Sequence, residues 1–212
     1  KQWKNKKAYV NNRDVIELMI KKEPKVYYLP NRRYNYSNTG YCFLSAIVEK
    51  VSGMTFGNYL DTKIFKPNEM HHSMVFDTSL NKINNPSFAI GHMKNGRIAK
   101  KYYLNGVLGD KGIMCSIEDL FKFNQALLSY KIIKKDLLDQ TFKPMHKDLY
   151  KWDNYGLGWR INAKDKIVYH TGWWKGFRSY YINKLNTNET IIILSNTTRG
   201  SFLKLKDLLD LL

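Results

Sequence analysis

A change of hydrophobic period near Tyr155 restricts the fold of this 212-residue chain more than any other feature. Before it, apolar residues recur at helical spacing. After it, runs rich in β-branched and aromatic residues predict strands at 156–161, 166–170, 177–183 and 190–194, with a hairpin turn at 185–188. Helices followed by an antiparallel meander predict an α+β fold.

The first 150 residues or so are expected to be mainly helical, and residues from about 151 to 212 to form the sheet and a closing helix over 201–212. Helices are predicted at 12–22, about 40–53, 55–66, 116–127 and 135–142, with Asn12, Thr55 and Ser116 as N-caps. The second of them carries an apolar stripe: Phe43, Leu44, Ile47, Val48 and Val51.

The net charge of +17, from 35 Lys and Arg against 18 Asp and Glu, raises the question of a polyanionic partner. The basic residues are spread along the whole chain and form no compact basic-aromatic module, so we expect no nucleic-acid partner. Peripheral attraction to an anionic cell envelope or membrane surface is the better expectation. No apolar run of about 18 residues exists, so no membrane span is expected. The sequence does not indicate an oligomeric state.

The cysteine and histidine content argues against a bound metal or other cofactor. Cys42 and Cys115 form no C-x-x-C pair, and a free buried thiol is expected at Cys42. His71 and His72 are adjacent and have no third ligand at a recognised spacing. We therefore expect no metal and no cofactor.

Two short segments carry side chains suited to catalysis. In Tyr36-Ser37-Asn38, a phenol and a carboxamide lie two residues apart on a turn ahead of an apolar helix, an arrangement suited to proton transfer and substrate orientation. The alternative is an ordinary turn tyrosine followed by Asn38 as a helix N-cap.

The second segment is His170-Thr171-Gly172-Trp173, at the end of a predicted strand. Gly172 would let a ligand approach the backbone, and the Trp173 N–H would be a donor for an acyl oxyanion or a carboxylate. The alternative is a strand histidine with its hydrogen bonds satisfied in the core, and tryptophans that only pack.

Tyr36-Ser37-Asn38, followed by a helix ending in Ser52-Gly53, resembles the second motif of the serine β-lactamase and penicillin-binding-protein superfamily, in its class C-like branch of esterases, peptidases and lactamases. His170-Thr171-Gly172 is similar to the third motif, where Lys-Thr-Gly or His-x-Gly occurs. Residues 64–70, 112–120 and 155–196 resemble the same branch in the same order, so the resemblance covers about residues 23 to 200.

The resemblance implies a β-lactamase/transpeptidase-like fold, with residues 1–212 as the C-terminal portion of one catalytic domain. It implies Tyr36 as general base, Asn38 as a ligand of the substrate oxygen and His170 as a candidate cation. Thr171, Gly172 and Trp173 would bind substrate, with the Trp173 N–H as half of the oxyanion hole. It also implies a small-molecule or peptide substrate and an exported location.

The family's nucleophile is the serine of Ser-x-x-Lys, which precedes the Tyr-x-Asn turn. No serine precedes Tyr36, and the later matches at 79–82 and 201–204 stand in the wrong order. We therefore expect the nucleophile upstream of Lys1 in a longer serine hydrolase acting on an ester, peptide or β-lactam, and no activity in residues 1–212 alone. The alternative is a non-catalytic protein that binds cell-wall peptides. Histidine in place of lysine at position 170 favours an esterase or peptidase over a β-lactamase.

Overall fold

The computed structural model describes residues 9–76, 88–100, 102–146, 154–198 and 205–211. The chain divides into two compact units. The first comprises residues 1–88 and 101–123, and the second comprises residues 89–100 and 124–212. Helix α4 (Ile117–Leu128) contributes residues to both units.

Short helices dominate the first unit. They are α1 (Asn12–Lys22), α2 (Asn38–Ser52) and α3 (Phe56–Leu60), which continues through a π-helical segment (Asp61–Phe65) and a 3₁₀ turn (Lys66–Asn68). A further 3₁₀ turn spans Tyr103–Gly106, and β1 (Met74–Val75) pairs antiparallel with β2 (Ile113–Met114). The predicted helical character of this region is confirmed.

The helix caps explain where these helices begin. The Asn11 side chain accepts from the Asp14 N–H in a capping box, and the Thr55 side chain accepts from the Asn58 N–H. The prediction for Thr55 is confirmed, whereas the cap of α1 is Asn11 and not Asn12. Asn12 is buried, and its side chain bonds to the backbone of Leu108.

Two apolar clusters form the core of the first unit. One contains Phe65, Met70 and Val75, with Phe56 and Leu60 of α3 packed against it. The other contains Val10, Cys42 and Val107. Three members of the α2 stripe lie outside both clusters and are 55%, 55% and 83% exposed: Leu44, Ile47 and Val51.

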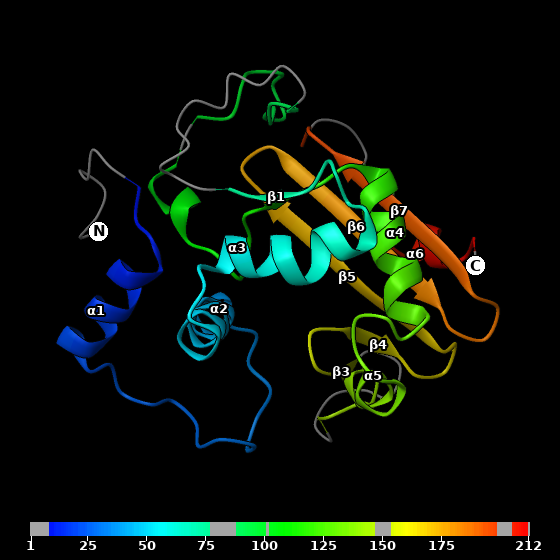
Figure 1. Cartoon of the computed structure of the whole chain (residues 1–212), viewed down its shortest axis with the longest axis horizontal. Helices are drawn as coiled ribbons and strands as arrows, with labels where there is room; N and C mark the ends of the chain where they lie inside the picture. Colours follow the sequence, from blue (N-terminus) through cyan, green and yellow to red (C-terminus); the bar gives the residue numbers. More distant parts are fainter. Residues whose placement is uncertain (1–8, 77–87, 101, 147–153, 199–204, 212) are drawn as a thin grey trace. The chain divides into compact units, whose positions relative to one another are not determined.

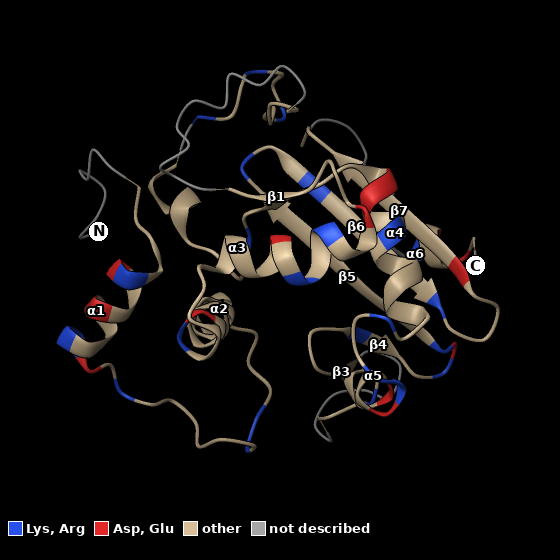
Figure 2. Ribbon diagram, in the orientation of Figure 1, with Lys and Arg blue, Asp and Glu red and all other residues tan. Residues whose placement is uncertain are grey.

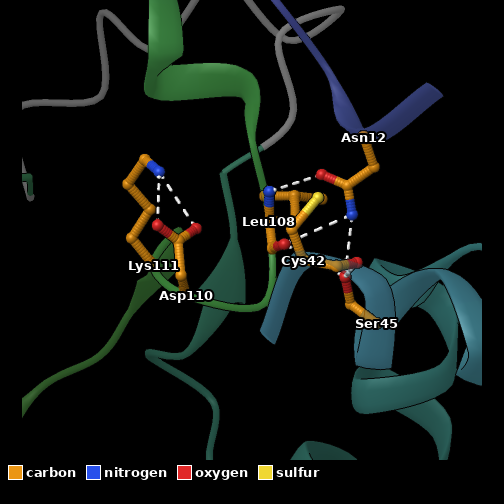
Figure 3. Close-up of polar contacts among 6 residues, drawn as sticks. All are labelled: Asn12, Cys42, Ser45, Leu108, Asp110 and Lys111. Atoms are coloured by element: carbon orange, nitrogen blue, oxygen red, sulfur yellow. Dashed lines mark hydrogen bonds and ion pairs between the residues drawn. The ribbon is translucent and has the colours of Figure 1, made fainter. Parts of the chain in front are cut away.

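A buried hydrogen-bond network of Asn12, Ser45 and Leu108 joins α1, α2 and the loop after Gly106 (Figure 3). The Asn12 side chain donates to Ser45 Oγ (2.7 Å) and to the Leu108 carbonyl (3.2 Å), and accepts from the Leu108 N–H (2.7 Å). Ser45 Oγ in turn donates toward the Cys42 carbonyl (2.9 Å). One amide therefore bonds to both backbone groups of Leu108, whose carbonyl oxygen also lies 3.0 Å from Ser45 Oγ.

Replacing Asn12 by alanine should destabilise the protein by about 2 kcal/mol, because it leaves the Leu108 N–H and carbonyl without this partner. Urea unfolding followed by circular dichroism measures the change. Arg13→Ala is the matched control, since Arg13 is the next residue of α1 and its side chain is 87% exposed. Equal midpoints for the two variants would contradict this role of Asn12.

The second unit is built on a five-stranded antiparallel sheet with strand order β3-β4-β5-β6-β7 (Figure 1). The strands are β3 (Asn154–Tyr155), β4 (Arg160–Asn162), β5 (Ile167–Trp174), β6 (Phe177–Lys184) and β7 (Glu189–Ser195). Each strand pairs with its neighbour in the chain, so the predicted meander is confirmed.

Two predicted strands differ from the structure more than the others do. The first predicted strand, 156–161, is wrong over its first half, because the Gly156 N–H bonds to the Trp159 carbonyl in a turn that includes Gly158 at φ 87°. The strand at 166–170 continues to Trp174. Helices α5 (Lys135–Thr141) and α6 (Leu205–Leu209) are present, and residues 201–204 and 212 of the predicted closing helix lie outside the described residues.

The core of the second unit lies between the sheet and α6. Ile167, Tyr169, Ile182 and Leu208 are each at most 6% exposed. A polar network adds hydrogen bonds between α4 and the sheet. Tyr181 Oη donates to Asn124 Oδ1 (2.6 Å), and Asn124 Nδ2 donates to Thr190 Oγ1 (3.1 Å).

Lys and Arg are distributed over many helices, strands and loops of the described chain, in agreement with the even spread in the sequence (Figure 2). In the part of the chain that the structure describes, no helix is both long and apolar enough to cross a membrane.

Candidate active site

The Tyr36 turn lies in the first unit, directly before α2. Ser37 is the N-cap, and its Oγ accepts from the Gly40 N–H at 3.1 Å. Asn38 is the first helical residue, so the alternative of Asn38 as the cap is wrong. Because Ser37 satisfies the helix end, the Asn38 amide is not needed for capping. Asn38 is exposed and Tyr36 is 43% exposed, so both are accessible to a ligand.

The His170 segment lies in the second unit, on β5. A two-residue turn with positive φ at Lys175 and Gly176 joins β5 to β6, and Trp174 pairs with Phe177. This is the geometry of a type I′ hairpin, whose closing pair exchanges hydrogen bonds. Backbone groups alternate in an antiparallel ladder, so those of Thr171 and Trp173 point away from β6. The Leu185 N–H bonds to the Lys166 carbonyl, which agrees with even-numbered residues facing β6.

The edge of β5 beyond Tyr169 has no strand partner among the described residues, because β4 pairs with β5 only over Ile167–Tyr169. The Trp173 N–H therefore points out of an open strand edge, as the oxyanion-hole hypothesis requires. The Trp173 side chain is 72% exposed, and the Arg178 guanidinium lies over its ring, 5.2 Å from the centroid.

Gly172 pairs with Ser179 of β6. A Cβ atom at position 172 would lie 2.3 Å from Ser179 Oγ, so glycine also serves the packing of the two strands here.

His170 has hydrogen-bond partners on both ring nitrogens. Nδ1 lies 2.9 Å from the Thr171 carbonyl oxygen, and Nε2 lies 3.0 Å from Tyr155 Oη. The Tyr155 and His170 rings meet edge to face, with centroids 6.2 Å apart. Sequence reasoning assigned no role to Tyr155, although it opens one of the stretches that carry the family resemblance.

The pKa of His170 is lowered from its ordinary value of 6.5, mainly by burial and also by the positive charge of Arg160, against an opposing hydrogen bond to Thr171. The ring is therefore largely uncharged at neutral pH. This finding argues against His170 as the cation of the site.

The lowered pKa predicts a pH dependence of stability. The folded state binds this proton less readily than the unfolded chain, so the free energy of unfolding should decrease as pH falls below about 6.5. The decrease ends once pH has passed the lower pKa of the folded state. Urea midpoints at a series of pH values, compared with His170→Gln, measure it: the variant should show a shallower decrease between pH 7.5 and 5. Parallel curves would contradict the assignment.

The other residues considered from the sequence are the possible metal ligands, the two cysteine thiols and the late Ser-x-x-Lys matches. Among the described residues, no three His, Cys, Asp or Glu side chains gather as a metal site. Burial raises the pKa of Cys42 and of Cys115 to about 11, so neither thiol is an activated nucleophile. The two late Ser-x-x-Lys matches, 79–82 and 201–204, lie outside the described residues. A hollow of about 600 Å³ in the second unit, bordered by Lys164, Lys166, Lys184 and Lys206, contains none of the predicted site residues.

Comparison with known proteins extends these observations. Residues 3–212 match the family model described as Beta-lactamase. The chain is 30% identical over 210 residues to penicillin-binding protein 4* of Bacillus subtilis (strain 168), covering 92% of this chain and 46% of that protein. The chain thus spans about half the length of the curated relatives it matches.

Solved structures agree in fold. A penicillin-binding protein from Bacillus halodurans superposes with a TM-score of 0.80 at 22% identity, covering 99% of this chain and 65% of that one. The D-amino acid amidase of Ochrobactrum anthropi SV3, complexed with D-phenylalanine, superposes with a TM-score of 0.72 at 20% identity, covering 93% and 65%. At these identities the likeness concerns the fold alone. Since the family model covers nearly the whole chain, the chain belongs to the β-lactamase family.

Proposed function

We propose that this chain supplies the proton-transfer and oxyanion-binding residues of a serine hydrolase that forms an acyl-enzyme and hydrolyses it. The acylated serine would come from residues outside Lys1–Leu212, because no serine precedes Tyr36. The observation that best supports the proposal is the register of β5 in a His-x-Gly motif: it directs the Trp173 N–H away from β6, at an edge with no strand partner in the described part of the chain.

Each residue has a role in this reaction. The Tyr36 phenol takes the proton of the attacking serine and returns it to the leaving group, with the lysine of Ser-x-x-Lys as the cation that favours the phenolate. The Asn38 amide holds the oxygen of the scissile ester or amide. The Trp173 N–H stabilises the tetrahedral oxyanion together with the N–H of the serine.

The substrate class is an ester or amide of a small acyl donor or peptide. The relative from Bacillus subtilis is named a penicillin-binding protein, and the solved relative from Ochrobactrum anthropi is named a D-amino acid amidase. An uncharged His170 is a poor anchor for a β-lactam carboxylate, so esters and amides are favoured over β-lactams.

The test is hydrolysis by protein expressed from its complete reading frame, with a p-nitrophenyl ester, a D-alanine amide and benzylpenicillin as probes. We expect turnover of the ester and the amide, with penicillin slower. Tight binding of cell-wall peptides without turnover of any probe would instead support a non-catalytic binding protein.

A further inference from the structure

The partners of His170 settle which of its ring nitrogens carries hydrogen. The Thr171 carbonyl can only accept a hydrogen bond, so Nδ1, at 2.9 Å from it, must be the donor. In the uncharged ring Nε2 is then the acceptor, and the Tyr155 hydroxyl, at 3.0 Å, donates to it. The ring has no N–H left to offer a ligand.

Tyr155 is well placed to hold this arrangement. It is 6% exposed and lies on β3, and its backbone N–H donates a hydrogen bond to Asn154 Oδ1 at 2.8 Å. Asn154 is itself 5% exposed and its amide donates to the His146 carbonyl at 2.7 Å. The backbone that carries the Tyr155 phenol is thus held by a buried polar neighbour.

We propose that Tyr155 is a positioning residue that caps His170 Nε2, so that the His170 side chain presents neither a positive charge nor a free N–H, and that the site consequently prefers acyl donors without a carboxylate at this position. The preference rests on the proposed function. The cap itself does not, because it concerns contacts within the second unit only.

The charges and phenols around His170 favour the uncharged state. Arg160 on β4 opposes a second positive charge. On β6, the register partner of His170 is Tyr181, whose own pKa is raised to about 12 by burial and which therefore stays a neutral phenol. Tyr155 on β3 completes the set. None of these groups provides the negative charge that would stabilise an imidazolium.

The cap is tested by the ¹⁵N chemical shifts of the His170 ring, measured on protein from the complete reading frame and assigned with His170→Gln. At pH 7.5 we expect hydrogen on Nδ1 and a hydrogen-bonded lone pair on Nε2. Tyr155→Phe should move the Nε2 shift toward that of an unbonded nitrogen.

Tyr181→Phe is the matched control, because its hydroxyl donates to Asn124 and not to His170. It should leave both ring shifts in place. An imidazolium or hydrogen on Nε2 in the unmodified protein, or an unchanged Nε2 shift in Tyr155→Phe, would overturn the proposal.

The preference is tested by binding of two peptides that differ only at the terminus, N-acetyl-D-alanyl-D-alaninamide and N-acetyl-D-alanyl-D-alanine. The chemical shift of the Trp173 backbone N–H is followed during the titration, so the measurement needs no turnover of the peptide. We expect the amide to bind about tenfold more tightly, a difference of about 1.4 kcal/mol. His170→Lys should narrow or reverse the ratio.

The two proposals fail separately. Tighter binding of the carboxylate peptide would assign recognition to a cation such as Arg178 and overturn the inference, as would failure of both peptides to bind. Binding of the amide without hydrolysis of any probe would contradict the proposed function and leave the Tyr155 cap on His170 intact.

Discussion

Tyr36→Phe is expected to lower kcat/KM by about 10²–10⁴-fold in the complete protein, because phenylalanine keeps the ring and removes the only atom able to exchange a proton. The measurement is the rate of ester and amide hydrolysis. Tyr34→Phe is the matched control, two residues earlier in the same loop and outside the motif. Its rates should stay near those of the unmodified protein.

An equal loss in both variants would point to the loop's conformation and away from the Tyr36 hydroxyl. The helix end does not confound the comparison, because Ser37 caps α2 in either case. Unfolding midpoints of both variants are expected to match that of the unmodified protein.

Asp119→Ala is expected to cost about 3 kcal/mol of folding free energy. The Asp119 carboxylate is fully buried, and its Oδ2 accepts from the His72 N–H (2.7 Å) and from Ser73 Oγ (2.8 Å). Alanine leaves both donors without this acceptor and opens a void at the start of α4.

Urea unfolding measures this change. Glu118→Ala is the control, since Glu118 is the neighbouring carboxylate and is exposed. Asp119→Asn, which keeps one carbonyl oxygen as acceptor, should recover part of the loss. A loss no larger than that of Glu118→Ala would show that the buried carboxylate does not hold the 72–73 turn.

The same residue shows what sequence patterns can and cannot predict. Ser116 was expected to cap α4, and the Asp119 N–H does bond to Ser116 Oγ at 3.1 Å. The carboxylate, however, bonds to residues 47 and 46 positions earlier in the chain. A local pattern specifies a cap, whereas only the tertiary fold decides which donors a buried carboxylate meets.

The meander was predictable because its period and turn residues are local properties. The turn at Gly156–Trp159 was not, because its alternating sequence imitates a strand and the positive φ of Gly158 decides the matter.

Part of the candidate site was likewise predictable from local sequence, and part was not. Tyr36, Asn38 and His170–Trp173 were identifiable from motifs. The Tyr155 cap on His170 was not, because it joins residues 15 positions apart through a turn and an intervening strand.

The central claim is that Tyr36 serves a serine nucleophile supplied by residues outside Lys1–Leu212. Its most direct test is mass spectrometry of protein from the complete reading frame after treatment with a fluorophosphonate probe, with the adduct located by peptide mapping. We predict one adduct, on the serine of a Ser-x-x-Lys sequence that precedes Tyr36, and slower labelling in Tyr36→Phe. An adduct on a serine within Lys1–Leu212, or no adduct on intact protein, would contradict it.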